Sequence, residues 1–146
     1  MTQGQFMNKT ILFNTEMFEA LLNGKKTVFV IPIESKKIKD ETFVSYFHPN
    51  FTTFKTSYHS VFSISHPFKI GDTVEIREYR KKRSFLIKIE TIDVERVQAI
   101  DRKTNLYNEH KKYWDLTNKK GYKLEDNPFA YVCSFELLRK DDNKTL

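Results

Sequence analysis

The order of apolar and polar residues near the N-terminus predicts a strand, a short helix and a second strand. Ile11–Phe13 is an apolar run, and Thr27–Ile33 is rich in the β-branched residues that favour strands. Between these runs, apolar residues recur at helical spacing and form one buried stripe, consisting of Met17, Phe18, Leu21 and Leu22.

The ends of this helix carry the usual signals. Asn14 or Thr15 can cap its N-terminus by accepting a backbone N–H of the first turn, and Gly24 suits a left-handed C-cap. The polar run that follows, from Lys25 through Lys26 to Thr27, is not needed for packing. A polar cluster at a helix-to-strand turn can form a binding site, or it can be a solvated turn near a helix C-terminus. Local physics leaves both interpretations open.

Two aromatic-rich stretches, Thr42–Phe47 and Thr52–Ser65, predict two strands or a hairpin, with a turn at Pro49 and Asn50. Their aromatic side chains can pack the hairpin against a sheet, or they can form a lid or a stacking surface for bases. The residues concerned are Phe43, Tyr46, Phe47, Phe51, Phe54, Tyr58 and Phe62.

A third strand is expected over Thr73–Tyr79, after a turn at Gly71 and Asp72. Alternation places Glu78 on the same side as Val74 and Ile76, where a carboxylate is costly unless it is paired or lies in a cleft. Glu78 is therefore a functional candidate, with Lys26 as its expected partner. The same pairing would also serve a purely structural role.

The next segment combines a basic turn with a long strand. Tyr79 precedes four cationic residues, Arg80, Lys81, Lys82 and Arg83, which are either a solvated hairpin tip or a contact surface for phosphates. Ser84–Val94 then predicts a strand whose alternation shifts phase near Thr91, as at a β-bulge. Asn105–Leu116 predicts a helix in which Trp114 is a core residue or the aromatic wall of a site.

Composition and charge narrow the possible functions. The chain has 146 residues, 39% of them hydrophobic and 14% aromatic, which favours one packed, β-rich domain. Its net charge of +6 favours a polyanionic partner such as RNA or a nucleotide. Residues 1–8 and 141–146 are expected to be a flexible lead-in and tail.

The sequence carries no signal for a disulfide, a metal site, a membrane span or a signal peptide. The single cysteine, Cys133, cannot form an intramolecular disulfide, and the four histidines lack metal-binding spacing, so we expect no metal and no cofactor. No apolar run approaches the roughly 20 residues that span a bilayer, and the N-terminus lacks a signal peptide's apolar core. The chain is therefore expected to be cytoplasmic and not membrane-bound, and the sequence does not indicate its oligomeric state.

Three segments in order resemble the ASCH domain family of the PUA-like superfamily, in particular its phage and bacterial members. They are ILFNTEMFEALLNGKKT (Ile11–Thr27), GDTVEIREY (Gly71–Tyr79) and NPFAYVCSFELL (Asn127–Leu138). The resemblance implies an α+β fold, a small β-barrel with about two flanking helices. It implies one ASCH-like domain over residues 9–140, with residues 34–66 as an inserted, aromatic-rich β-hairpin.

The chain also departs from the family pattern. Val30 and Ile31 stand where members often carry arginines after the turn lysine. ASCH amidohydrolases acting on N4-acetylcytidine resemble one another in a lysine, a threonine three residues later and a more distant glutamate. Lys26 matches the lysine and Glu109 matches the glutamate loosely, but Phe29 occupies the threonine position. This replacement favours binding over catalysis.

Two function classes therefore remain, and the first is favoured. It is a binding module for nucleic acid or a modified nucleoside, whose ligand contacts would be Asn14, Thr15, Lys25, Lys26, Thr27, Glu78, Tyr79 and Trp114. The second is a hydrolase, either an N4-acetylcytidine-type amidohydrolase or a ribonuclease, with Lys26 as nucleophile or base and Glu78 or Glu109 as its acid–base partner. A third possibility is a phage-type accessory scaffold whose cleft has decayed.

Overall fold

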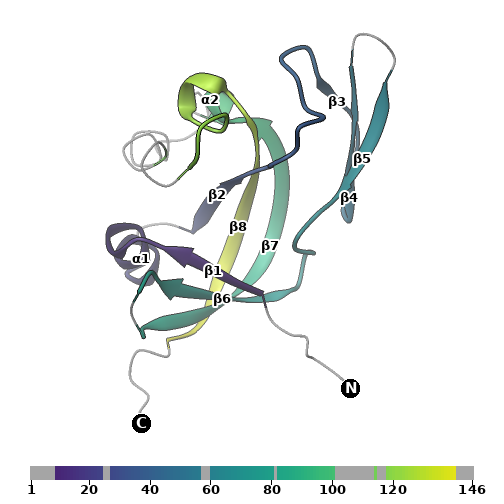
Figure 1. The fold of residues 1–146 in the computed structure, drawn as a ribbon. Helices are drawn as coiled ribbons and strands as arrows, with labels where there is room; N and C mark the ends of the chain where they lie inside the picture. Colours follow the sequence, from purple (N-terminus) through teal and green to yellow (C-terminus); the bar gives the residue numbers. More distant parts are fainter. Residues whose placement is uncertain are drawn as a thin grey trace. The chain divides into compact units, whose positions relative to one another are not determined.

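The structure is a computed structural model that describes residues 9–24, 27–56, 60–80, 82–100, 114 and 118–140. These residues are mostly β-structure, with eight strands in two sheets and few helical segments (Figure 1). The five-stranded sheet has the order β1-β6-β7-β8-β2, and its strands in that order are Lys9–Phe13, Thr73–Glu78, Ser84–Arg96, Phe129–Lys140 and Val28–Pro32. The three-stranded sheet has the order β3-β4-β5, with strands Phe43–His48, Phe51–Lys55 and Val61–Ser65.

The chain divides into two compact units, neither of which is continuous in sequence. The first unit draws its described residues from 1–29, 70–91 and 133–146, and the second from 30–69 and 92–132. The long strands β7 and β8 each contribute residues to both units. Each unit is described separately below.

The first unit is built on β1, β6 and the start of β7. β1 runs parallel to β6, with Ile11 opposite Ile76 and Phe13 opposite Glu78. β6 and β7 form an antiparallel hairpin in which Ile76 lies opposite Phe85. The predicted alternation along β6 is confirmed, because Val74, Ile76 and Glu78 are all buried.

Helix α1 (Thr15–Leu22) packs beside β1 and β6 in this unit (Figure 1). The predicted apolar stripe is confirmed, because Met17, Phe18, Leu21 and Leu22 are buried. Asn14 is the N-cap, and its side-chain oxygen accepts the backbone N–H of Met17 at 2.9 Å. Gly24 has φ +74°, the left-handed conformation expected after the helix end.

The second unit contains the β3–β4–β5 meander, which covers most of the expected insertion at 34–66. The turn at Pro49 and Asn50 is where the pattern predicts it, but Thr52–Ser65 forms two strands, β4 and β5, rather than one. Some of the aromatic residues pack in the core, as the packing interpretation expects, and others are exposed, as a lid or stacking surface would require. Phe54 is fully buried, whereas Phe43, Tyr46 and Phe47 are exposed.

Trp114 belongs to an apolar cluster in this unit. The cluster consists of the buried residues Val30, Val97, Ile100, Trp114 and Ala130. Val97–Ile100 forms the short helix α2, which the sequence pattern did not predict, and Leu124–Asp126 forms the 3-10 turn η1. The predicted helix Asn105–Leu116 lies outside the described residues except for Trp114, as do the lead-in 1–8, the tail 141–146 and Tyr58.

Strand β7 shows the predicted phase shift. Ile89 and Ile92 are buried with Glu90 and Thr91 both exposed between them, so the alternation slips by one residue. The strand continues to Arg96, two residues beyond the expected end. Within the described part of the chain, no helix is long and apolar enough to cross a bilayer.

Candidate functional site

Most of the predicted ligand contacts belong to the first unit. Asn14, Thr15, Thr27, Glu78 and Tyr79 are described there. Lys25 and Lys26 lie outside the described residues, so the expected pairing of Lys26 with Glu78 stays a prediction. Glu109 and Lys81 also lie outside them.

Glu78 is the last residue of β6, and its side chain is only 1% exposed. The guanidinium of Arg83 donates from Nε to Glu78 Oε1 at 2.8 Å, and its Nη2 donates to Glu19 Oε2 on α1. The same guanidinium lies 5.0 Å from the ring centroid of Phe18. Arg83 therefore ties the β6–β7 hairpin to α1.

The hydrogen bonds to Glu78 and then to Glu19 raise the pKa of Arg83 above its usual value. Sequence reasoning missed this arrangement because it treated Arg80–Arg83 as one basic run. A signal was available: if residues 79–82 form the turn, Glu78 and Arg83 face each other across the hairpin. The backbone N–H of Glu78 indeed donates to the carbonyl of Arg83 at 3.0 Å.

The tip of this hairpin presents aromatic and cationic side chains to solvent. Tyr79 is 50% exposed, and its backbone N–H donates to the carbonyl of Phe13 at 2.8 Å. Arg80 has φ +63°, and its guanidinium lies 5.1 Å from the Tyr79 ring centroid. Lys82 is exposed, whereas Arg83 turns back toward Glu78.

Phe29 occupies the position that the ASCH resemblance assigns to a catalytic threonine. Its side chain is fully buried, and its ring packs against Phe13 and Phe135 with centroids 6.2 and 6.0 Å away. Phe29 is therefore a core residue of the first unit and offers no hydroxyl to a substrate.

Trp114 belongs to the second unit and is buried in the apolar cluster defined above. Its indole Nε1 donates to the carbonyl of Tyr122 at 2.8 Å. This placement agrees with the core interpretation of Trp114, while its role as an aromatic wall stays a prediction.

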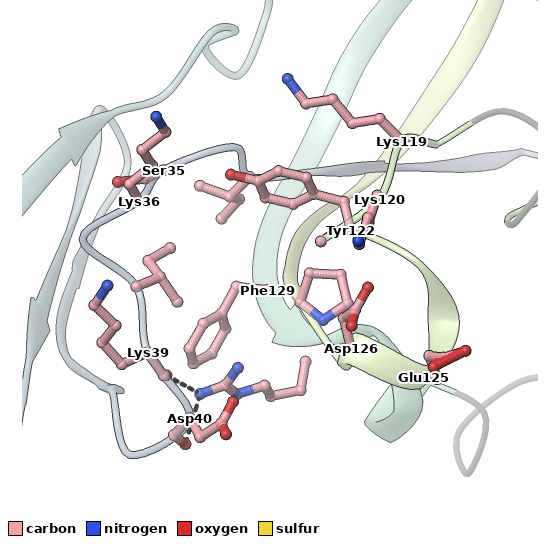
Figure 2. Close-up of a pocket in the computed structure, with 15 residues that line it drawn as sticks. Ser35, Lys36, Lys39, Asp40, Lys119, Lys120, Tyr122, Glu125, Asp126 and Phe129 are labelled. Carbon is pink, nitrogen blue, oxygen red and sulfur yellow. Dashed lines mark hydrogen bonds between the residues drawn. The ribbon is translucent and has the colours of Figure 1, made fainter.

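The second unit also contains a pocket of about 720 Å³ that sequence reasoning did not anticipate. One wall is the segment from Ile33 to Asp40, and the other is the segment from Lys119 to Phe129 (Figure 2). Tyr122 and Phe129 contribute rings between these walls, and lysines come from both. Its lining residues are far apart in sequence, so no local motif marks it.

Among the residues that the structure describes, no group of three or more His, Cys, Asp or Glu side chains is arranged to hold a metal ion.

Comparison of the chain with models of protein families, with curated proteins and with solved structures finds no match.

Proposed function

We propose that this chain is an ASCH-like binding module for nucleic acid or a modified nucleoside, with a PUA-like barrel and a basic site at the helix-to-strand turn of the first unit. The observation that carries the proposal is the Glu78–Arg83 pair, a buried carboxylate held by a guanidinium directly beside the exposed Tyr79 and Arg80. A carboxylate set among apolar neighbours is costly to maintain, so a function at this position would account for it.

The described side chains suit recognition of a single-stranded nucleic acid. Tyr79 offers a half-exposed ring on which a base can stack, and Arg80 and Lys82 offer charge to the phosphates. Lys25 and Lys26 would extend this positive surface at the turn. Thr27, whose carbonyl accepts the N–H of Phe135 at 2.9 Å, holds the start of β2 beside β8.

Other groups at the site would act at shorter range. Asn14 uses its side-chain oxygen as the N-cap of α1, which leaves its amide N–H groups to donate to a ligand. Thr15, at the first position of α1, would add a hydroxyl beside the positive end of the helix dipole. Glu78 is buried, so it would serve the site by holding the Arg83 guanidinium rather than by touching a base itself.

The core position of Phe29 supports binding over hydrolysis, because the threonine hydroxyl of the amidohydrolase pattern has no counterpart there. Under the hydrolase alternative, Lys26 would need another partner, such as Glu78 or Glu109. Under the scaffold alternative, the chain would neither bind oligonucleotides nor turn over a nucleoside.

A binding assay with a fluorescently labelled single-stranded RNA tests the proposal. We expect Tyr79→Leu to weaken binding by roughly tenfold, since stacking of a base on an aromatic ring contributes about 1–3 kcal/mol. Tyr46→Leu is the matched control, because the exposed fraction of Tyr46 is similar (56% against 50% for Tyr79) but it lies on β3 of the second unit. Equal effects of both substitutions would contradict a site at the hairpin tip.

The same preparation should be incubated with N4-acetylcytidine. The binding proposal predicts no product, whereas turnover that Lys26→Ala abolishes would establish the hydrolase. Absence of both RNA binding and turnover would leave the scaffold.

A further inference from the structure

We propose that the pocket of the second unit binds a nucleoside phosphate, with the base against Tyr122 and the phosphate on lysines of the two walls. This proposal is independent of the proposed function, because the pocket uses none of the residues of the first unit.

The pocket is held in shape by one arginine. Arg96, near the end of β7, lies with its guanidinium 4.1 Å from the ring centroid of Phe129. Its Nη1 donates to the carbonyl of Asn127 at 3.0 Å on one wall. Its Nη2 donates to the carbonyls of Lys39 and Asp40 at 2.9 and 3.0 Å on the other wall (Figure 2). The same Nη2 also donates to the carbonyl of Thr42 at 3.0 Å.

This clamp joins two segments that are separated by more than fifty residues along the chain. Because both Nη1 and Nη2 already donate to backbone carbonyls, the Arg96 guanidinium acts as a structural brace rather than as a ligand contact. A pocket braced in this way is preformed, which lowers the entropic cost of binding a small molecule.

The inner surface of the pocket is apolar. Ile33, Pro128 and Phe129 are buried there, and Tyr122 is half-buried and reaches across toward Ser35 and Lys36 (Figure 2). One face of Phe129 is occupied by Arg96, so Tyr122 is the ring that remains accessible to a planar group. Such a surface suits a base rather than a sugar or a bare anion.

The rim of the pocket is cationic. Lys36, Lys39 and Lys120 are exposed, and none of them forms an ion pair with another described residue. Lys119 differs, because its Nζ bonds Glu34 at 2.8 Å and lies 5.6 Å from the Tyr122 ring centroid. Three lysines are therefore available to a phosphate, which a lysine ammonium binds as a point charge.

Acidic side chains on the rim limit the ligand to a compact one. Asp40, Glu125 and Asp126 line the same pocket, and Asp126 already accepts the backbone N–H of Lys123 at 2.9 Å. Carboxylates repel a continuous polyanion but accept hydrogen bonds from ribose hydroxyls or an exocyclic amine. A volume of about 720 Å³ lies within the usual range for small-molecule sites and accommodates a mononucleotide.

Calorimetric titration of the full chain with adenosine monophosphate, adenosine and inorganic phosphate tests the assignment. We expect the monophosphate to bind at least tenfold more tightly than either fragment, because it alone engages both the ring and the lysines. Fluorescence of the single tryptophan gives a second readout, since the Trp114 indole bonds the carbonyl of Tyr122.

Substitutions separate the two halves of the site. Lys36→Gln combined with Lys39→Gln should weaken the monophosphate at least fivefold and leave adenosine unchanged. Tyr122→Leu should weaken the monophosphate and adenosine alike. Lys37→Gln is the matched control, because Lys37 lies on the same segment but does not line this pocket and places its Nζ 5.8 Å from the Phe62 ring centroid.

Three results would overturn the proposal: no binding of the monophosphate at millimolar concentration, phosphate binding as tightly as the nucleotide, or an equal loss in Lys37→Gln. The Tyr79→Leu variant should bind the monophosphate normally. Failure at the pocket is therefore distinguishable from failure of the RNA site in the first unit.

Discussion

At the scale of single residues, loss of the Arg83 side chain should destabilise the first unit by breaking an ion pair with a buried carboxylate. Its guanidinium donates to the buried Glu78 and to Glu19, so Arg83→Leu leaves the Glu78 carboxylate in an apolar setting with one donor fewer. We expect the free energy of unfolding to fall by about 3 kcal/mol, as when one partner of a buried ion pair is removed. Urea denaturation measures this change.

Arg77→Leu is the control for that substitution. Arg77 bonds Glu75 at 3.2 Å, but both side chains remain partly exposed to solvent. An exposed pair contributes about 0–1 kcal/mol, so this variant should be nearly as stable as the parent chain. If both variants lose the same unfolding free energy, the burial of Glu78 does not make its ion pair with Arg83 more important for stability than an exposed pair.

His66, in the second unit, should make stability depend on pH. Its Nδ1 lies 2.9 Å from the carbonyl of Pro49, which can only accept, so Nδ1 carries the proton. Nε2 then accepts from the hydroxyl of the buried Thr52 at 2.6 Å. Desolvation lowers the pKa of His66, and the charge of the nearby His48 lowers this pKa further. The hydrogen bond to Pro49 acts in the opposite direction and raises it.

A lowered pKa in the folded state means that the unfolded chain takes up the proton first as the pH falls. Stability due to His66 is therefore complete above its ordinary pKa of 6.5 and is lost as the pH drops through 6.5 toward the folded value. Between pH 7.5 and 5.5, the free energy of unfolding should decrease by at most about 1.4 kcal/mol per pH unit. In His66→Gln this part of the slope should disappear; an unchanged slope would contradict the assignment.

Residue-scale prediction from sequence succeeded where phase alone decides the outcome. The alternation of β6 placed Glu78 on the buried side, because side chains of a strand point alternately to opposite faces. The hydrogen-bond partners of buried polar residues were harder to predict. Hairpin register brings Arg83 to Glu78, and sheet pairing separately brings His66 to Thr52. Nothing in the local sequence marks the pocket closed by Arg96, whose acceptors lie in two distant loops.

At the scale of secondary-structure elements, α1 offers a test that separates a structural role of Asn14 from a binding role. Asn14→Ala removes the acceptor of the Met17 N–H and should cost about 1 kcal/mol in unfolding free energy. Asn14→Ser keeps an N-cap and should be close to neutral. If Asn14 also donates to a ligand, the serine variant should bind RNA more weakly at unchanged stability; unchanged affinity would limit Asn14 to capping.

Elements with strong punctuation were predictable from sequence, and those without it were not. Gly24 follows the C-terminal end of α1, and Gly71 precedes the start of β6; both have positive φ. The break between β4 and β5 has no glycine or proline within Thr56–Ser60. It is closed instead by Thr56, whose N–H donates to the Ser60 carbonyl at 2.9 Å and whose Oγ1 accepts the Ser60 N–H at 3.2 Å.

At the scale of the whole molecule, the two compact units are built from interleaved segments, and periodicity along the chain cannot reveal such a division. The boundary on β7 falls between Thr91 and Ile92, where the buried alternation slips. The sequence therefore predicted the phase shift on β7 but not that a boundary between units falls there. The ASCH resemblance concerns segments of both units, and its test is functional.

The net charge of +6 predicts that RNA affinity falls as the salt concentration rises. The steepness of this fall counts the phosphates that the protein neutralises. For a single strand, the slope of log affinity against log salt changes by roughly 0.7 for each phosphate that a variant no longer neutralises. Arg80→Gln combined with Lys82→Gln should therefore flatten the slope by roughly 1.4. Lys55→Gln combined with Lys88→Gln lowers the net charge equally at two strand positions, on β4 and β7, that are not part of the Tyr79–Lys82 turn, and should flatten the slope far less. If both pairs flatten the slope to the same extent, the attraction comes from overall charge, and the Tyr79–Lys82 tip is not the contact surface.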